Sequence, residues 1–550
     1  MKPSDQNIDN NQSINISNYL RLNAEKSPEK PALLHPVRIT YNELEAEVNR
    51  CSFGLESAGV KTGTRTILMV PAGHEFFILT FALLRIGAIP VMIDPGMGIK
   101  AMLNALAGLK AEAFIGIPKA HLLRLIRPSV FKTVRTRITA GLPWFPGGLR
   151  LMNSIPKDQD KKYPLCMVDA NKIAAIFFTS GSTGPAKGVI YTAGMLNNQI
   201  KVTKSIFNIS HEEIDLCTFP LLGLFAICHG NSSVIADMDM MHPVKLDPSR
   251  VIKNIQDFGC TQMFGSPMIL NKLSLYGSAN RIKLLSLRLI ISAGAPVHHS
   301  VLESFGQLTV PEAKIHTPYG ATEALPVTDI DTSELLLKDS DITENENGIC
   351  IGYPVKGLDV RIIEINDSQI LSWDEAVHMP ANEVGEIVTK GPWVTTEYFN
   401  NTDANRLAKI PDPGNQSIWH RMGDLGRMDN QGRLWFYGRK SQRVITLEGT
   451  LFTIPCEAVF NHHPLVLRSA LVGIPDNVTG LKKPVICIQL KPGNYPTKKL
   501  TQELLELGSA NIKTKGILNI LFKEEFPVDP RHNAKIFREK LAIWAVKKSK

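Results

Sequence analysis

The sequence contains no pair of cysteines at the close spacing that a zinc site or a redox motif requires. Its eight cysteines are scattered over 550 residues, at Cys51, Cys166, Cys217, Cys228, Cys260, Cys350, Cys456 and Cys487. This pattern argues against a metal-binding or disulfide-stabilised fold. It predicts reduced thiols with structural roles, as in a cytoplasmic protein.

Long apolar segments are also missing. The most apolar stretch, residues 76–93, includes Arg85, Gly87 and Pro90, so we expect a buried helix, a turn and a strand rather than a membrane span. Residues 1–15 are polar, lack the apolar core of a signal peptide and are predicted to be disordered. The net charge of +9 suits an anionic ligand or a membrane surface, and no nucleic-acid-binding motif accompanies it.

Acidic residues are absent between Ala113 and Lys157, where basic and apolar residues alternate. One interpretation is a solvated basic face whose apolar side belongs to the core. The other is a helix and loop that contact an anionic membrane or a pathway enzyme, which would place the protein at the membrane periphery.

A chain of this length exceeds what one core can hold, so several domains are expected. Apolar runs and helical periodicity alternate to about residue 330; the spacing of Leu44, Val48, Cys51, Leu55 and Ala58, for example, predicts a helix that stops at Gly59. The fold class is therefore α/β, with mostly parallel sheets and a small β-rich part in an N-terminal domain over 16–437. A hinge at 438–441 and a small α+β C-terminal domain over 442–550 follow, and residues 366–382 are expected to be a surface excursion.

The most informative segment follows the predicted strand Ile173–Phe178. It combines glycines, hydroxyls and one lysine, in the order Thr179, Ser180, Gly181, Ser182, Thr183, Gly184, Pro185, Ala186, Lys187, Gly188. Glycine lets backbone N–H groups approach a phosphate, hydroxyls donate to its oxygens, and lysine adds positive charge. The pattern indicates polyphosphate binding, but it is neither a Walker A loop nor a dinucleotide-binding turn.

Four further motifs fit the same chemistry. Small residues at Gly294, Ala295 and Pro296 follow a predicted strand and leave room for an adenine ring. Tyr319 and Gly320 offer a stacking ring and a close backbone approach, Glu323 offers an oxygen ligand for Mg²⁺, and Asp424, between two glycines, can accept bonds from ribose hydroxyls. Lys535 lies near the C-terminus. Each motif alone is also compatible with an ordinary turn or a solvated charge.

Taken in order, these motifs resemble the adenylate-forming superfamily of acyl-CoA ligases, adenylation domains and luciferases, over about residues 15–545. The resemblance implies a mobile C-terminal lid and the attack of a carboxylate on the α-phosphate of MgATP. By the same resemblance, residues 179–184 and Lys187 hold the β- and γ-phosphates, and residues 294–296 and Tyr319 frame adenine. It also implies the roles of four further residues or pairs: Thr322 contacts the α-phosphate, Glu323 holds Mg²⁺, Asp424 and Arg439 bind ribose, and Lys535 bridges the reacting oxygens.

Some stretches depart from ordinary acyl-CoA ligases and are similar to the olefin β-lactone synthetases of this superfamily. Ser441 replaces the usual hinge residue, Glu448 replaces a small lid residue, and Gly223 in the acyl-pocket segment is expected to open room for a branched chain. This finer resemblance implies a fatty-acid-type substrate, a 2-alkyl-3-hydroxyalkanoate, whose own hydroxyl closes a β-lactone. His229, His298 and His299 are candidate bases by residue type alone. The alternatives are a long-chain fatty acyl-CoA ligase and a non-catalytic protein that binds an acyl nucleotide.

Overall fold

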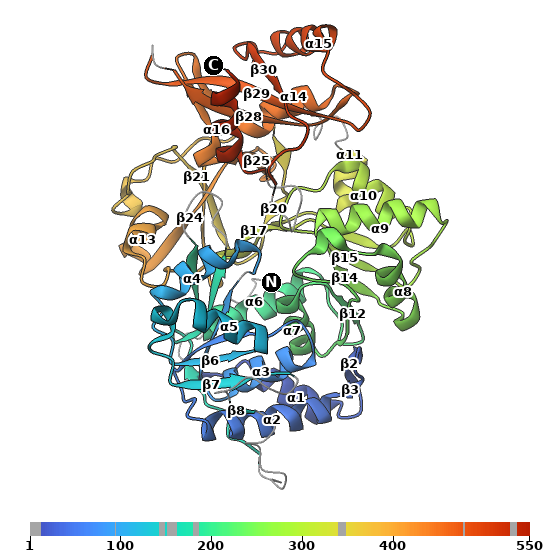
Figure 1. The fold of residues 1–550 in the computed structure, drawn as a ribbon, viewed down its shortest axis with the longest axis vertical. Helices are drawn as coiled ribbons and strands as arrows, with labels where there is room; N and C mark the ends of the chain where they lie inside the picture. Colours follow the sequence, from blue (N-terminus) through green and yellow to red (C-terminus); the bar gives the residue numbers. More distant parts are fainter. Residues whose placement is uncertain are drawn as a thin grey trace, which may run out of the picture.

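The computed structural model describes residues 13–93, 95–141, 149–150, 162–179, 186–338, 348–476, 479–528 and 536–549. In Figure 1 the N-terminal part of the chain forms the lower body, and residues after about 440 form a separate layer at the top. Strands β21 (Asp359–Ile363) and β24 (Ser417–Met428) lie between these two parts, so the antiparallel sheet that contains them connects the lower body to the upper layer.

Two seven-stranded sheets dominate the lower body. The first has the order β11 (Lys187–Thr192), β10 (Ile173–Thr179), β5 (Ile89–Ile93), β4 (Arg65–Met69), β6 (Ala113–Gly116), β7 (Thr136–Thr139) and β8 (Leu149–Arg150). Its neighbouring strands are parallel except for β10 and β11. The accompanying helices are α2 (Tyr41–Ser57), α3 (His74–Arg85), α4 (Ile99–Ala107), α5 (Pro118–Ile126) and α6 (Ala193–Ile206).

The second sheet has the order β16 (Lys314–His316), β15 (Leu289–Ile291), β14 (Gln262–Phe264), β12 (Ile214–Cys217), β13 (Ser232–Ile235), β2 (Pro31–His35) and β3 (Ile39–Thr40). All its pairs are parallel except β2 with β3. Its helices are α1 (Asn18–Lys26), α7 (Pro220–His229), α8 (Pro248–Phe258), α9 (Pro267–Ala279) and α10 (His299–Gly306). The predicted α/β class with mostly parallel sheets is thus confirmed.

The third sheet is antiparallel and contains β19 (Ile349–Cys350), β25 (Leu434–Arg439), β24 (Ser417–Met428), β22 (Gly385–Lys390) and β21 (Asp359–Ile363), with β23 (Lys409–Asp412) paired to β24. A smaller sheet joins β17 (Tyr319–Ala321), β18 (Ala324–Asp329) and β20 (Tyr353–Pro354). Helices α11 (Thr332–Lys338) and α13 (Thr402–Ala408) lie in the same part of the chain.

Residues 366–382 are mostly exposed, as expected for a surface excursion, but the segment is also anchored on the third sheet. Trp373 stacks on Trp419 of β24, with ring centroids 3.9 Å apart, and Ile370 is buried beside them. Backbone oxygens of the segment also accept hydrogen bonds, one of them from Lys440 to the carbonyl of Asn366 at 2.9 Å. The acidic composition of the segment gave no sign of this contact with β24, because the contact depends on a few aromatic and aliphatic side chains.

The C-terminal layer consists of β26 (Val444–Thr446), β27 (Gly449–Leu451), α14 (Thr453–Asn461), β28 (Val466–Pro475), β29 (Lys482–Leu490), α15 (Lys498–Ser509), β30 (Asn519–Phe522) and α16 (Arg538–Lys548). Its buried side chains form two clusters that draw only on residues after 443. A buried ion pair between Glu457 and Arg538, 2.7 Å apart, joins α14 to α16. The predicted hinge at 438–441 and the domain limits stay predictions.

Local sequence signals explain the first helices. A capping box between Thr40 and Glu43 begins α2, and the predicted stripe of Leu44, Val48 and Leu55 is fully buried. The predicted disorder over 1–15 is wrong for its last three residues: Ser13–Ile14 form β1, which pairs with β9 (Val168–Asp169). The buried side chain of Asn15 donates to three backbone carbonyls, which explains why this polar residue belongs to the fold.

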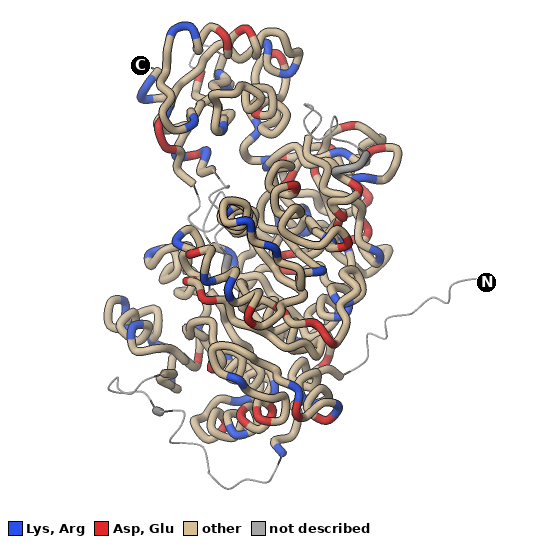
Figure 2. Tube along the Cα trace, turned by 90° about the vertical axis from the view of Figure 1, so that its right-hand side faces the viewer, with Lys and Arg blue, Asp and Glu red and all other residues tan. Residues whose placement is uncertain are grey.

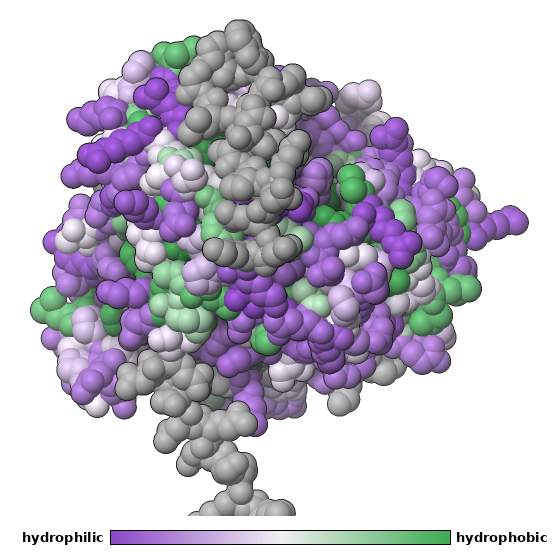
Figure 3. Space-filling model, turned by 90° about the horizontal axis from the view of Figure 1, so that it is seen from below, coloured by the Kyte–Doolittle hydropathy of each residue, from purple (hydrophilic) through white to green (hydrophobic). Residues whose placement is uncertain are grey.

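The eight cysteines are thiols that form no disulfide, and all but Cys166 are buried, as expected for structural thiols. None of the helices in the described ranges is both long and apolar enough to cross a membrane. Figure 2 shows basic and acidic residues interspersed along the chain, and the face in Figure 3 is mainly hydrophilic with small hydrophobic groups.

Helix α5 bears on the two interpretations of the basic stretch 113–157. Its neighbours Val130 and Phe131 are buried, but Leu122, Leu125 and Ile126 on the helix itself are exposed, the last two by 65% and 64%. The core interpretation therefore holds for Val130 and Phe131 but not for these three side chains of α5. Residues 142–148 and 151–161, with Trp144, Phe145 and Lys157, lie outside the described residues.

Candidate active site

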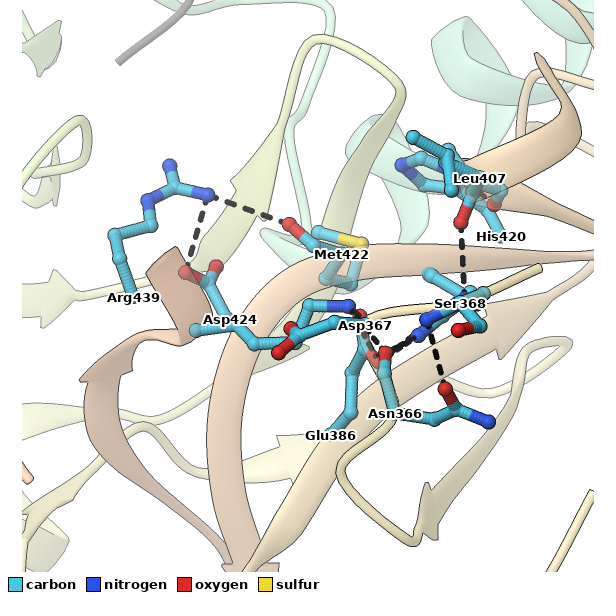
Figure 4. A network of polar contacts seen from close by, with 12 residues as sticks. Asn366, Asp367, Ser368, Glu386, Leu407, His420, Met422, Asp424 and Arg439 are labelled. Atoms are coloured by element: carbon cyan, nitrogen blue, oxygen red, sulfur yellow. Dashed lines mark hydrogen bonds and ion pairs between the residues drawn. The ribbon is translucent and has the colours of Figure 1, made fainter. Parts of the chain in front are cut away.

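Tyr319, Asp424 and Arg439 meet at one corner of the site, as Figure 4 shows for the last two. Asp424 and Arg439 are direct partners in the β24–β25 ladder, which places their side chains side by side. The Tyr319 hydroxyl donates to Oδ2 of Asp424 at 2.7 Å, and Nη1 of Arg439 lies 3.0 Å from Oδ1. Three predicted residues from distant parts of the chain are thus brought together.

The electrostatics of this corner follow from burial. Asp424 is only 2% exposed, and burial raises the pKa of its carboxyl group, while the nearby Arg439 opposes that rise. The same ion pair raises the pKa of Arg439. Oδ1 of Asp424 lies within ion-pair distance of Arg439 but, among the described residues, receives no aligned hydrogen bond. It is a buried acceptor with remaining capacity for a donor.

Thr322 and Glu323 form the two-residue turn between β17 and β18, where Ala321 pairs with Ala324. Gly320 is required before this turn because a Cβ atom there would lie 2.4 Å from the carbonyl oxygen of Ala324. Oε1 of Glu323 accepts a hydrogen bond from the Tyr398 hydroxyl at 2.7 Å. The carbonyl of Thr322 accepts one from the hydroxyl of Tyr191, so the tight turn is held from both sides.

Lys187 begins β11, directly after the glycine-rich segment. Its Nζ atom lies 4.8 Å from the centroid of the Tyr398 ring, and the adjacent chain is fixed by a hydrogen bond of 2.7 Å from Phe399 N to Gly188 O. Tyr398 therefore connects Lys187 with Glu323. Thr179 ends β10 opposite Lys187, while Ser180, Gly181, Ser182, Thr183 and Gly184 lie outside the described residues.

The small-residue turn at Gly294, Ala295 and Pro296 leaves β15 at the same sheet edge at which β16 leads to Tyr319, because Ile291 and His316 are paired in parallel. Gly294 has a φ of +96°, a conformation that favours glycine. The carboxyl ends of parallel strands are where ligands bind in such sheets. Lys535 lies outside the described residues, next to Ile536, which pairs with Val528.

The candidate bases differ in their surroundings. His229 is buried, its Nε2 lies 2.9 Å from the carbonyl of Ile200, and burial lowers its pKa to about 4. His298 contacts Ser300 at 3.1 Å, and His299 lies 3.5 Å from Glu303 of the same helix. His298 and His299 contact residues within four positions of the chain, and His229 contacts a backbone carbonyl, as structural histidines commonly do.

The expectation that Gly223 opens room for a branched chain was wrong. A Cβ atom at this position would lie 2.6 Å from Sγ of Cys217 and 3.0 Å from the Phe77 ring, so the glycine allows close packing of α7. An apolar cavity of about 30 Å³ does border α7, where Leu221, Leu224 and Phe225 contribute to its lining.

Sequence reasoning missed Tyr398, Thr395 and Lys409, which surround Glu323. The amide of Thr395 donates to the carbonyl of Glu323 at 2.8 Å, and Lys409 lies against both Thr395 and Tyr398. No motif marks these residues, because their spacing in sequence reflects neither a helix face nor a loop. The only local signal was a lysine within the short apolar stretch 407–410.

With this geometry established, comparison with known proteins identifies the class. The AMP-binding enzyme family matches residues 20–399, and the chain belongs to this family of adenylate-forming enzymes. The resemblance to the adenylate-forming superfamily is thereby confirmed.

Within that class, the chain is 41% identical over 518 residues to the olefin beta-lactone synthetase of Stenotrophomonas maltophilia, covering 93% of this chain and 92% of that protein. The fold matches the anthranilate CoA ligase AuaEII in complex with anthranoyl-AMP, with a TM-score of 0.79, 21% identity and complete coverage of both chains. It also matches ATP-bound MatB from Rhodopseudomonas palustris, with a TM-score of 0.78, 19% identity and coverage of 98% and 100%.

Proposed function

We propose that this ligase activates a 2-alkyl-3-hydroxy fatty acid as its acyl-adenylate and then closes the activated acid to a β-lactone. The observation that carries the proposal is the 41% identity to an olefin beta-lactone synthetase, which extends over 93% of the chain. An identity of this extent includes both the lower body and the C-terminal layer. It therefore concerns the whole catalytic unit rather than a shared nucleotide fold.

ATP fits the residues that the fold brings together. Oδ1 of Asp424 offers a buried acceptor for a ribose hydroxyl, and Tyr319 with residues 294–296 provides a ring and a turn for adenine. Lys187 adds positive charge for the β- and γ-phosphates at the end of the glycine-rich segment, and Thr322 is assigned to the α-phosphate. Preorganised charge of this kind is what the approach of two anions requires.

Mg²⁺ fits Glu323. The described residues contain no group of three potential metal-ligating side chains, so a bound ion would take most of its ligands from phosphate and water. Mg²⁺ favours such an arrangement, with one or two protein carboxylates beside substrate phosphates. Bound there, the ion would neutralise phosphate charge, while Tyr398 and Thr395 keep the Glu323 carboxylate in place.

The reaction then proceeds in two steps. A carboxylate oxygen of the acid forms a bond to the α-phosphorus, the bond to the β-phosphate oxygen breaks, and pyrophosphate leaves. The 3-hydroxyl oxygen next forms a bond to the acyl carbon, its proton passes to a base, and AMP leaves as the acyl–phosphate bond breaks. Because both groups belong to one substrate, the hydroxyl acts at high effective concentration and no external acceptor is needed.

The test is an incubation of the purified protein with a 2-alkyl-3-hydroxy acid and MgATP, without coenzyme A. We expect equal amounts of AMP, pyrophosphate and a product that is one water lighter than the acid, measured by mass spectrometry. The matched substrate is the same acid without its 3-hydroxyl group, which should support exchange of labelled pyrophosphate into ATP but yield no lactone. Product formation that depends strictly on coenzyme A would instead establish the fatty acyl-CoA ligase.

Lys535 provides a separate check on adenylation. We expect Lys535→Ala to abolish pyrophosphate release while ATP binding, measured by calorimetry, is retained, because removing one positioned charge costs roughly 10²–10³ in rate. Near-normal turnover by this variant would remove Lys535 from the mechanism.

A further inference from the structure

Lys409 is a buried lysine next to the catalytic carboxylate. It is 7% exposed, begins β23 and is paired with His420 of β24. Its Nζ atom donates to the carbonyl and, at 3.2 Å, to the hydroxyl of Thr395. In the part of the chain that the structure describes, no carboxylate lies within ion-pair distance of it. A lysine is rarely buried in this way, because the charge loses its hydration without gaining a counter-ion.

The two residues that Lys409 contacts are those that hold Glu323. Thr395 donates its amide hydrogen to the Glu323 carbonyl, and Tyr398 donates its hydroxyl hydrogen to the Glu323 carboxylate. Lys409 binds the first through hydrogen bonds and lies 5.2 Å from the ring centroid of the second. Lys409 is thus linked to the backbone carbonyl of Glu323 through Thr395 and to its carboxylate through Tyr398.

The charge of Lys409 is also coupled to the site. Burial lowers the pKa of Lys409 to about 7, while Glu323 opposes this shift and Lys187 adds to it. Lys409 is therefore within electrostatic reach of both Glu323 and Lys187, so its ammonium group can respond to the charges that ATP and Mg²⁺ bring.

We propose that Lys409 is a positioning residue for adenylation, which fixes Thr395 and Tyr398 so that the Glu323 carboxylate faces the metal and phosphates. The inference rests on the proposed role of Glu323 as the Mg²⁺ ligand. It gives a reason for a lysine at a buried position, where an apolar side chain would avoid the cost of desolvating a charge.

The test compares Lys409→Met and Lys409→Arg with a matched control, Lys390→Met. Lys390 also lies over an aromatic ring, 4.8 Å from the centroid of Trp419, and pairs with Asp412 at 3.0 Å in the same sheet, but it makes no contact with Thr395 or Tyr398. The readouts are kcat and KM in ATP–pyrophosphate exchange and, independently of turnover, the Mg²⁺ concentration that half-saturates ATP binding in calorimetry.

For Lys409→Met we expect kcat to fall by about 10- to 100-fold, the scale of a misplaced catalytic group, with a several-fold higher Mg²⁺ requirement and an unchanged KM for the acid. Lys409→Arg should recover part of the activity because it also donates to Thr395, and Lys390→Met should match the wild type. A Lys409→Met protein with wild-type kcat and Mg²⁺ dependence would overturn the inference.

Should Lys409→Met fail to fold, Tyr398→Phe removes only the hydroxyl that binds Glu323 and should raise the Mg²⁺ requirement in the same way. Wild-type Mg²⁺ dependence in that variant would equally overturn the inference. Failure of the wild-type protein to exchange pyrophosphate with any fatty acid would instead refute the proposed function itself.

Discussion

Asp424→Asn combined with ribose-modified ATP gives the sharpest test of the nucleotide site. The variant keeps the shape of the side chain but removes the negative charge that faces Arg439 and Tyr319. Arg439 retains a hydrogen bond to the carbonyl of Met422 at 3.3 Å and is one-third exposed, so water can solvate it. The fold should therefore tolerate the change, and the effect should concern ligand binding.

The magnitude follows from the free oxygen. Oδ1 of Asp424 lacks an aligned hydrogen bond among the residues described, so it can accept one from a ribose hydroxyl. A hydrogen bond to a charged group contributes about 1.5–3 kcal/mol. This corresponds to about 10- to 150-fold in kcat/KM for ATP. When 2′-deoxy-ATP or 3′-deoxy-ATP replaces ATP, kcat/KM of the wild-type protein should fall by that factor. For Asp424→Asn, which has already lost this hydrogen bond, the same replacement should lower kcat/KM only slightly.

The assay is pyrophosphate exchange with the three nucleotides and both proteins, which forms a double-mutant cycle. Tyr319→Phe is the matched control, because it removes a donor to Asp424 but leaves the carboxylate and the ring. It should keep the full penalty for the deoxy nucleotides. If Asp424→Asn also keeps that penalty, so that the two losses are additive, Asp424 does not bind the ribose and the assignment is refuted.

Three further predictions concern stability and surfaces. Burial raises the pKa of Asp215 to about 7, so unfolding between about pH 4 and 7 releases a proton, and the free energy of unfolding falls as the pH rises through this range. Asp215→Asn should therefore raise the free energy of unfolding, measured in urea, by at most about 4 kcal/mol at pH 7.5 and leave it unchanged near pH 4. An equal gain at both pH values would contradict this. Gly438→Ala should lower the free energy of unfolding by about 2–5 kcal/mol, because φ is +117° and the new Cβ would lie 2.1 Å from Thr453 Oγ1. Gly432 also has a positive φ but has open space around it, so Gly432→Ala should cost only about 1 kcal/mol. Equal losses in the two variants would refute the steric argument. If the exposed face of α5 contacts anionic lipid, vesicles of that lipid should carry the protein to the top of a flotation gradient at low salt but not at high salt. The Leu125→Glu variant should float less than the wild type, and absence of flotation at both salt concentrations would exclude this contact.

The sequence was sufficient where the deciding interactions are local. The capping box and buried stripe of α2, the alternation of parallel strands with helices, and the glycine-rich segment after a buried strand all depend on residues near one another in the chain. Ordered motifs were likewise enough to identify the class of enzyme, and the AMP-binding family match confirms it. These features can be predicted without tertiary information because periodicity, capping and turn chemistry act over a few residues.

The tertiary structure alone decided how the site is assembled. Tyr319 of β17 meets Asp424 of β24 across 105 positions of sequence, and Tyr398 meets Glu323 of the β17–β18 turn across 75, because segments far apart in the chain converge there. Lys409 is buried beside Thr395 and Tyr398, and a different long-range contact fills the space at Gly223 with Cys217 and Phe77. Burial and long-range packing are properties of the folded chain, so no local pattern could have specified which lysine is buried beside Thr395 and Tyr398 or how the space at a given glycine is filled.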